Sequence, residues 1–225
     1  MDSYEKYKQS CYAVLTGDLV KSARLDSVNL KVVLQGLQEG QVRFNQTYAN
    51  SVVGRMTIFS GDSWQVLMSK FNLSFRLSLF FRALVKASEG LKADTRIALA
   101  WGQIDEETLN PDNISESTGQ AFTLSGRALA EMDRSKFLAM RLSDNLDYNS
   151  YGGLKYLAPS MLLLDAVSSR WTEKQSEIMA LTLLGCNQYQ IASELDIAQP
   201  TVYKSLNAAG WKRVKEFLDH VENSL

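Results

Sequence analysis

Hydrophobic residues recur at two different spacings over the first two thirds of the chain, and these spacings predict its strands and helices. Apolar runs and alternating patterns predict strands over 11–17, 95–104 and 136–142, with a two-stranded hairpin over 57–68. Apolar residues three or four positions apart predict helices over 26–49, 72–88 and 119–132. The order of these elements favours an α+β fold, in which helices pack on a face of one sheet.

The strongest of these helical patterns, over residues 72–88, mixes apolar and basic positions. Phe75, Leu79, Arg82 and Lys86 are spaced to follow one side of the helix, which predicts a mixed outer edge. Trp64 and Trp101 fall within predicted strands, and we expect both in the core or an interface rather than stacked on a base.

The last third of the chain carries a helical pattern of its own after a turn-rich loop (143–153) and a connector helix that begins near Pro159. Thr172 and Gln175 form a capping box for a helix that Gly185 ends. A short second helix, a turn at 196–198 and a third helix beginning near Pro200 follow. The small or apolar residues that would join these helices are Ile178, Leu181, Leu184, Ile191, Ala192, Leu195, Val202 and Leu206.

Composition and charge exclude several classes of protein. The 225 residues are 45% hydrophobic and 22% charged with a net charge of -1, which is typical of a globular chain and does not indicate a strongly basic body. The polar first ten residues lack a signal-peptide core, and no apolar stretch is long enough to span a membrane, so we expect a cytoplasmic protein. Two distant cysteines and one histidine leave little for zinc sites or Ser-His-Asp catalysis.

Charge is unevenly distributed near the C-terminus. Residues 199–215 contain four bases and no acid, although the whole segment 170–225 has six bases and seven acids. Basic residues there suit contact with phosphates. The candidate DNA-binding residues are Gln199, Thr201, Tyr203, Lys204, Asn207, Lys212 and Arg213. A plain helical bundle remains the alternative, and a module this weakly charged would need two copies on two half-sites.

Two Gly-Asp pairs are the candidate functional residues of the N-terminal region. Asp18 follows a predicted strand, and Asp62 lies in the hairpin turn, where Gly61 supplies freedom at positive φ. If the two strands are neighbours, the carboxylates come together, and Mg²⁺ or Mn²⁺ with a triphosphate is a natural partner for such a pair. Both aspartates can equally be ordinary turn formers. The candidate nucleotide-binding residues beside them are Gly61, Ser63, Lys21 and Ser22.

The segment 171–211 resembles the helix-turn-helix shared by LuxR-like proteins and sigma-factor region four. The matching positions are Ala192, Leu195, Ile197, Thr201, Val202 and Leu206. Asp196 stands where the turn usually has Gly, and Asp tolerates a left-handed conformation better than most residues.

Residues 11–142 resemble the catalytic palm of class III nucleotidyl cyclases. Asp18 in "GDLVKS" and Asp62 in "SGDSWQVL" match the two metal-binding aspartates, and "RIALAWGQI" is similar to a later strand. Arg127 matches an arginine that stabilises phosphate charge in the transition state, whereas Thr123 stands where the family has Asn. Ile58 stands where the family has a purine-reading Lys. The resemblance implies a ferredoxin-like palm and a homodimer, because these domains pair to complete their sites.

The whole chain is most similar to the SatD family, which shares "GD-x-x-x-S", "GD-x-x-Q-x-L" and a C-terminal helix-turn-helix. We therefore expect a palm domain (1–153), a connector helix (154–170) and a DNA-binding domain (171–225). The expected function is a DNA-binding transcriptional regulator whose palm binds metal or nucleotide as a sensor, or serves only for dimerisation. The alternative is a divergent nucleotidyl cyclase or nucleotidyltransferase that uses the two aspartates. For Arg127 a helix-edge charge, and for Arg96 a surface strand charge, are the simpler interpretations.

Overall fold

A computed structural model describes residues 11–144 and 154–224, so most of the predicted loop 143–153 lies outside the described residues. Within these ranges the chain forms one sheet and eight α-helices. The strands are β1 (Tyr12–Leu19), β2 (Val52–Phe59), β3 (Ser63–Met68), β4 (Thr95–Gly102) and β5 (Leu138–Leu142). The helices are α2 (Ser27–Thr47), α3 (Ser74–Lys86), α4 (Gln120–Ala130), α5 (Leu157–Ser169), α6 (Glu173–Leu183), α7 (Gln188–Glu194), α8 (Gln199–Ala208) and α9 (Trp211–Ser224).

The five strands lie in the order β2-β3-β1-β4-β5, with β1 at the centre. β1 is antiparallel to both β3 and β4, β2 is antiparallel to β3, and β5 is parallel to β4. The first four strands and the helices α2 and α3 therefore have the β-α-β-β-α-β order and strand directions of a ferredoxin-like unit. The α+β class and the predicted order of elements are confirmed.

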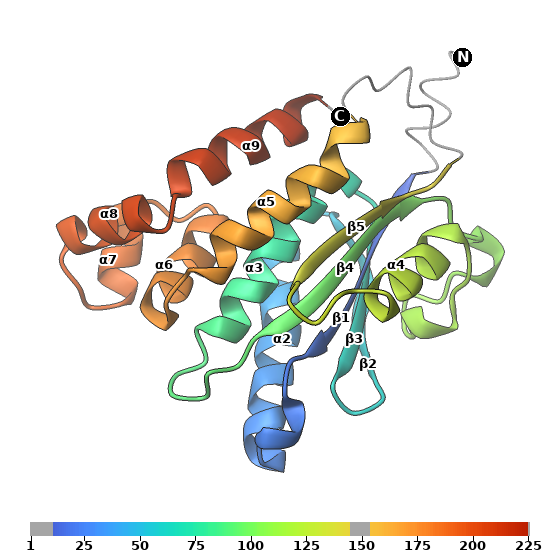
Figure 1. Ribbon diagram of the computed structural model, residues 1–225, viewed down its shortest axis with the longest axis horizontal. Coiled ribbons are helices and arrows are strands. Elements are labelled where there is room, and N and C mark those ends of the chain that lie inside the picture. The colour runs from blue at the N-terminus through green and yellow to red at the C-terminus, as the bar shows by residue number, and fades with distance from the viewer. Residues whose placement is uncertain (1–10, 145–153, 225) are drawn as a thin grey trace.

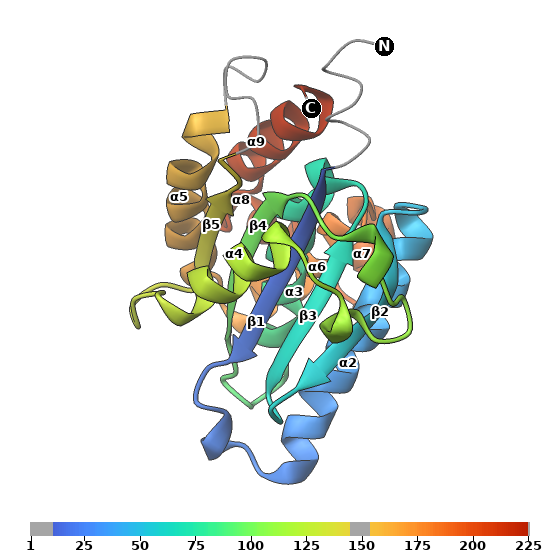
Figure 2. The same cartoon turned by 90° about the vertical axis from the view of Figure 1, so that its right-hand side faces the viewer.

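Helices cover the two faces of the sheet unequally. Figure 1 shows α4 alone on one side, whereas α3, α5, α6 and the helices that follow lie on the other. Figure 2 looks onto the α4 face, where α4 crosses the middle of the sheet and leaves the ends of β1 and β3 uncovered. The larger hydrophobic core lies on the opposite side, between the sheet and the helices α2, α3 and α6.

Helix α3 is buried on nearly every side, so the predicted mixed outer edge is wrong. Phe75, Leu79 and Arg82 are fully buried, and Lys86 is half-buried. The reason is that α6 packs along the side of α3 that faces away from the sheet. The pattern of one helix could not reveal this second layer, because the partner lies some hundred residues further along the chain.

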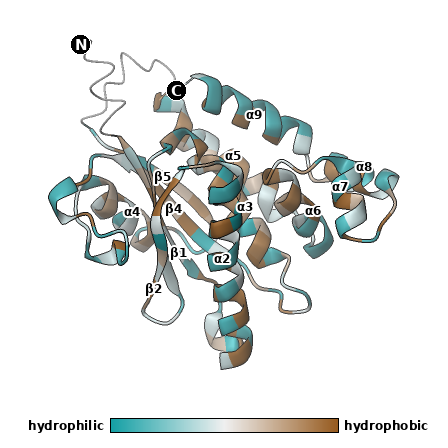
Figure 3. Cartoon of the chain, turned by 180° about the vertical axis from the view of Figure 1, so that it is seen from behind, coloured by the Kyte–Doolittle hydropathy of each residue, from teal (hydrophilic) through white to brown (hydrophobic). Residues whose placement is uncertain are grey.

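The C-terminal helices have the predicted boundaries and caps. Thr172 and Gln175 form the capping box of α6, and Gly185 has a φ of 84° directly after that helix. Asp196 has a φ of 50° in the turn between α7 and α8, the left-handed conformation expected of it. The sequence analysis assigned no element to α9, whose outer surface is mostly hydrophilic (Figure 3).

One hydrophobic cluster runs from the sheet through α3 into α6, α8 and α9. The proposed division near residue 170 therefore stays a prediction that needs a folding experiment. No helix among the described residues is both long and apolar enough to cross a bilayer.

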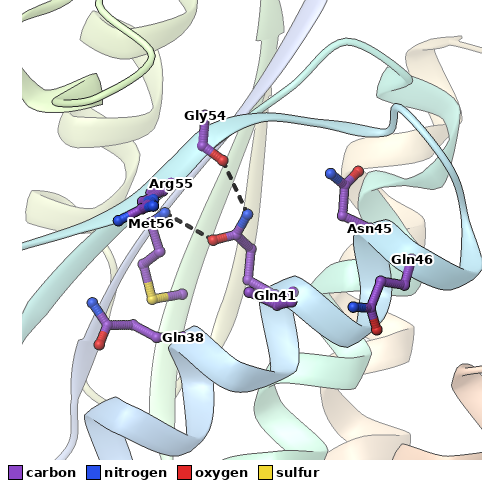
Figure 4. Close-up of a pocket in the computed structure, with 8 residues that line it drawn as sticks. Gln38, Gln41, Asn45, Gln46, Gly54, Arg55 and Met56 are labelled. Carbon is purple, nitrogen blue, oxygen red and sulfur yellow. Dashed lines mark hydrogen bonds between the residues drawn. The ribbon is translucent and has the colours of Figure 1, made fainter.

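The Gln41 side chain of α2 makes hydrogen bonds to the backbone of the edge strand β2 (Figure 4). The Gln41 amide donates to the Gly54 carbonyl at 3.1 Å, and its Oε1 accepts from the Met56 N–H at 2.9 Å. The Arg55 N–H donates to the Pro111 carbonyl at 3.2 Å. These bonds occupy backbone groups that an exposed edge would otherwise offer to another strand.

Candidate functional site

Alternation along the strands places the predicted aspartate on the open end of the α4 face. Asp18 lies on this face because Thr16 and Val14, two and four residues before it, contact α4 or the small core beneath it. In the sheet register Asp18 is opposite Ser63 of β3 on one side and Arg96 of β4 on the other. The row of these three residues forms one end of the candidate site.

Asp18 is bound to Arg96, so the simpler interpretation of Arg96 as a surface strand charge is wrong. Arg96 Nε donates to Asp18 Oδ1 at 2.9 Å, and its Nη2 donates to Oδ2. Neither side chain is exposed by more than 28%. The hydrogen bonds to Asp18 raise the pKa of Arg96, with partial burial opposing them and the charges of Asp18 and Asp62 adding to the rise.

Asp62 lies beside this pair in the hairpin turn. Gly61 has a φ of 86°, which confirms the positive φ expected of it, and the neighbouring Ser60 has a φ of 51°. The Asp62 carbonyl accepts from the Leu19 N–H at 3.2 Å, which holds the turn against the end of β1. The Ser22 hydroxyl donates to Asp62 Oδ2 at 2.5 Å. The structure therefore brings the two Gly-Asp pairs to one end of the sheet, as predicted.

The candidate nucleotide-binding residues gather around the same turn. Ser63 Oγ donates weakly to Asp62 Oδ1 at 3.4 Å, and Ser22 holds the other oxygen of that carboxylate. Lys21 has a φ of 58° and is exposed in the connection after β1. Ser22 and Ser63 therefore each contact the Asp62 carboxylate, whereas Lys21 is a solvent-exposed base in the same connection as Ser22.

A cavity of about 410 Å³ opens between this end of the sheet and α4. Its floor holds Thr16 and Gln65, and Gln65 Nε2 donates to Thr16 Oγ1 at 2.9 Å. The Thr16 hydroxyl lies 2.9 Å from that of Ser125 on α4, which ties the helix to the sheet. Gly126 and Ala130 form the α4 wall, and their small side chains leave the space open. The full lining is Thr16, Asp18, Phe59, Gln65, Arg96, Gly126, Leu129 and Ala130.

The candidate catalytic residues Thr123 and Arg127 do not line this cavity. Both are exposed on α4, one turn apart. The Thr123 hydroxyl donates to the Gly119 carbonyl at 3.2 Å, which is a bond within its own helix. Within one chain the structure does not join these two residues to Asp18 and Asp62, and their catalytic roles stay predictions.

The donor set fits a divalent cation only in a limited way. Both oxygens of Asp18 accept from Arg96, and one oxygen of Asp62 accepts from Ser22. Across residues 11–144 and 154–224, no three His, Cys, Asp or Glu residues are placed to hold a metal ion. Arg96 supplies one positive charge beside the two carboxylates. Because both aspartates already accept hydrogen bonds from side chains, these residues offer few free oxygen ligands for a metal ion.

The candidate DNA-binding residues lie on the outside of the C-terminal helices. Thr201, Tyr203, Lys204 and Asn207 of α8 are exposed, and Gln199 is half-buried at the start of that helix. Lys212 and Arg213 are exposed at the start of α9. Val202 and Leu206 of α8 are buried, which confirms the predicted inner face. All seven side chains therefore belong to one helix pair, and six of them are freely accessible.

Sequence reasoning missed the partner of Asp18 and the polar floor of the cavity. The signal that could have found Arg96 was cross-strand pairing, since opposite charges facing each other on neighbouring antiparallel strands attract. It was usable only once β1 and β4 were known to be neighbours. Thr16 and Gln65 carried no local signal, because a buried polar pair becomes visible only when the register is fixed.

Comparisons with known proteins do not assign the chain to a family. No protein-family model matches the chain, and no curated protein matches it. Two solved structures of a bacterial light-regulated adenylyl cyclase resemble it, with TM-scores of 0.44 and 0.42 and sequence identities of 16% and 19%. Each match covers 58% of this chain, and the two matches cover 75% and 42% of the respective cyclase chains. Likenesses of this size decide nothing about the activity of this chain.

Proposed function

We propose that this protein is a DNA-binding regulator that reads duplex DNA with α8 and binds a phosphorylated ligand at the β1–β3 end of its sheet. The observation that carries the first part is the outer face of α8. Its exposed polar side chains are Thr201, Tyr203, Lys204 and Asn207, which are uncharged or basic. The supporting geometry is a short α7, a turn with Asp196 in a left-handed conformation, and α8 packed through Val202.

Such a face suits the major groove, because amide and hydroxyl groups can reach base edges while lysine contacts phosphates. Lys212 and Arg213 at the start of α9 add charge near the end of α8. Residues 199–215, which span α8 and the start of α9, contain four bases and no acid.

The test is selection of bound duplexes from random DNA by the full chain, followed by affinity measurements on the selected sequence. Lys204→Ala should weaken binding to all sequences and reduce the slope of log affinity against log salt by about 1. Asn207→Ala should instead lose discrimination at particular base pairs, by about 1–3 kcal/mol. Lys174→Ala on α6, an exposed lysine paired with Glu177, is the matched control and should change neither quantity.

The ligand-binding part of the proposal rests on the cavity beside Asp18 and Arg96. The guanidinium of Arg96, which lines this cavity of about 410 Å³, suits a nucleotide phosphate, with the polar floor available to the rest of the ligand. Thermal unfolding with each ribonucleoside triphosphate, with and without Mg²⁺, tests it. One triphosphate should stabilise the parent, and Arg96→Gln should abolish that stabilisation.

If the protein is a sensor, ligand binding at the sheet must change DNA binding by α8. Saturating nucleotide should change the affinity for the selected DNA, since the C-terminal helices share a hydrophobic cluster with the sheet. An unchanged affinity would remove the sensing role and leave the two binding activities separate.

The second candidate is an enzyme that acts on a nucleoside triphosphate–magnesium complex. The observation that favours it is the meeting of Asp18 and Asp62 at one end of the sheet. In that case the aspartates would hold the metal that accompanies the phosphates, and the metal would neutralise charge on the leaving group. Incubation with each triphosphate and mass analysis of the products tests this. A product made by the parent and not by Asp62→Asn would support the enzyme.

A further inference from the structure

Gly126 leaves a space on the inner side of α4 that no described side chain fills. It lies within the helix, and its φ is not positive, so its backbone conformation does not require glycine. A Cβ built on Gly126 would meet no atom of the described residues within 4 Å, apart from its chain neighbours and its own helix backbone. Glycine also weakens the middle of a helix relative to alanine. What glycine provides at this position is therefore room beside the sheet.

This space belongs to the cavity of about 410 Å³ that Arg96 also lines. Phe122 and Leu129 lie four residues before and three residues after Gly126, which places all three on one side of α4. That side faces the sheet, because Phe122 is part of the small core between the helix and the strands. Leu129 and Phe59 add apolar and aromatic surface to the lining. The volume lies in the range of about 300–1,000 Å³ that is typical of small-molecule pockets.

The polar floor of the cavity contains one side chain with free hydrogen-bonding groups. Gln65 Nε2 donates to Thr16 Oγ1, and Ser125 Oγ donates to the Phe122 carbonyl at 3.0 Å. Because the Ser125 proton is used at that carbonyl, the bond between the two hydroxyls is donated by Thr16. This chain of bonds holds the Gln65 carboxamide in place. Its Oε1 and its second N–H make no further bond to the described residues and are available to a ligand in the cavity.

We propose that this cavity takes the base of a nucleotide and that Gln65 binds the edge of that base. A carboxamide offers an acceptor and a donor side by side, and the edge of a nucleobase can offer the complementary pair. Apolar and aromatic side chains such as Leu129 and Phe59 suit the faces of the ring. Arg96 lines the same cavity and is the group that meets phosphate.

This inference rests on the proposed function, because it names the part of the phosphorylated ligand that the cavity beside Arg96 holds. A ligand that consists of phosphate alone would leave the space beside Gly126 empty. It would also have no group that donates to the Gln65 carbonyl oxygen. The ring therefore accounts for two features of the cavity that the phosphates do not explain.

Filling the space with a side chain tests the proposal. Gly126→Leu adds a side chain to the cavity and removes no bond that the structure shows. Gly36→Leu on α2 is the matched control, because a Cβ at Gly36 also meets no described atom within 4 Å and α2 does not line this cavity. Both substitutions should raise the unfolding temperature without ligand, since leucine favours a helix more than glycine does. This rise in both variants would show that they fold.

The probes are the four ribonucleoside triphosphates and inorganic tripolyphosphate, each with Mg²⁺, and thermal unfolding of the full chain measures their binding. At least one nucleotide should stabilise the parent and Gly36→Leu equally, and tripolyphosphate should stabilise both less. Gly126→Leu should weaken nucleotide binding by about tenfold or more, because leucine occupies the space that the base needs. Gly126→Ala should have a smaller effect. Gln65→Met, which keeps the size of the side chain, should reduce the preference among the four nucleotides.

The base site and the phosphate site can fail separately. Equal stabilisation by tripolyphosphate and by all four nucleotides, unchanged in Gly126→Leu, would overturn the base site and leave a phosphate ligand at Arg96. Nucleotide binding that is as strong in Gly126→Leu as in Gly36→Leu would overturn the base site as well. If no probe stabilises the parent, this inference and the ligand-binding part of the proposed function are both wrong. DNA binding by α8 is measured independently of all these outcomes.

Discussion

At the scale of single residues, Arg82 binds three parts of the fold together. It is fully buried, and its Nε and Nη2 donate to both oxygens of Asp94 at 3.0 and 3.1 Å. Its Nη1 donates to Asp165 of α5 at 2.6 Å and to the Ser168 hydroxyl at 2.8 Å. The Asp165 carboxylate also accepts from the Phe137 N–H at 3.0 Å, which ties α5 to the start of β5.

Arg82→Met should therefore destabilise the protein by about 3–5 kcal/mol, because the substitution leaves two largely buried carboxylates without their cation. Urea unfolding of the parent and the variant measures the difference. Arg43→Met is the control, since Arg43 and its partner Glu194 are about half exposed and such pairs contribute under about 1 kcal/mol. A loss below about 1 kcal/mol for Arg82→Met would show that the network does not stabilise the fold.

The two cysteines should differ in reactivity. Burial raises the pKa of the Cys11 thiol to about 12, against a smaller opposing effect of a backbone hydrogen bond. Burial and the charge of Glu194 raise the pKa of Cys186 as well, but this side chain is half-buried. A raised pKa means less thiolate at a given pH, and the thiolate is the reactive species.

Alkylation of the native protein near about pH 8 should therefore label Cys186 first, with Cys11 labelled only after unfolding. Labelling should speed up as the pH rises, because both thiols ionise above their usual range. Mass analysis of peptides after timed labelling measures both rates, and Cys186→Ser should remove the early label. Early labelling of Cys11 would contradict its burial against the sheet.

At the scale of elements, sequence reasoning succeeded where the signal was local. The caps at Thr172 and Asn187 and the turn at Asp196 depend on neighbours within a few residues, and the pattern found two of the three. It failed at α3, whose outer side is covered by α6, and at Arg96, whose partner is on another strand. The sequence therefore predicted the candidate site as two turns that carry aspartates. The pairing of Asp18 with Arg96 could be predicted only once the register of β1 and β4 was known.

Helix α9, the element that the pattern missed, contacts the sheet and α3 region through Glu222 as well as through apolar side chains. Glu222 accepts from Arg76 Nε at 2.7 Å and from its Nη2 at 2.9 Å, and its carbonyl accepts from the Asn72 amide at 3.0 Å. Phe217 packs edge-on against Phe75 of α3 at 5.2 Å between ring centroids. The carboxylate and the guanidinium are both largely buried.

Glu222→Ala should cost about 1–3 kcal/mol, since it leaves the Arg76 guanidinium buried without its acceptor. Hydrogen exchange of the α9 amides should speed up more than that of β1. Glu216→Ala on the same helix removes an exposed pair with Arg213 and should change neither quantity measurably. Equal effects of the two substitutions would mean that α9 is held by its apolar contacts alone.

At the scale of the whole molecule, the sheet and the C-terminal helices share one hydrophobic cluster. α3 packs on the sheet with one side and on α6 with the other. The Tyr48 hydroxyl donates to the Leu183 carbonyl at 2.8 Å, and Trp171 Nε1 donates to the Ala209 carbonyl at 2.9 Å within the C-terminal helices. The hydrophobic cluster is continuous across the boundary predicted near residue 170, and that boundary stays a prediction.

Unfolding should accordingly be one cooperative transition rather than two. If the helices α6–α9 unfolded, α3 would lose its contact with α6 and Phe75 its contact with Phe217, so the sheet should lose stability together with the helices. Pulse-labelling hydrogen exchange along a urea series, analysed by peptide, measures this without any substitution. Peptides from β1, β4, α6 and α9 should share one midpoint. A separate, lower midpoint for residues 171–224 would instead establish a C-terminal domain that unfolds independently of the sheet, in line with the predicted boundary near residue 170.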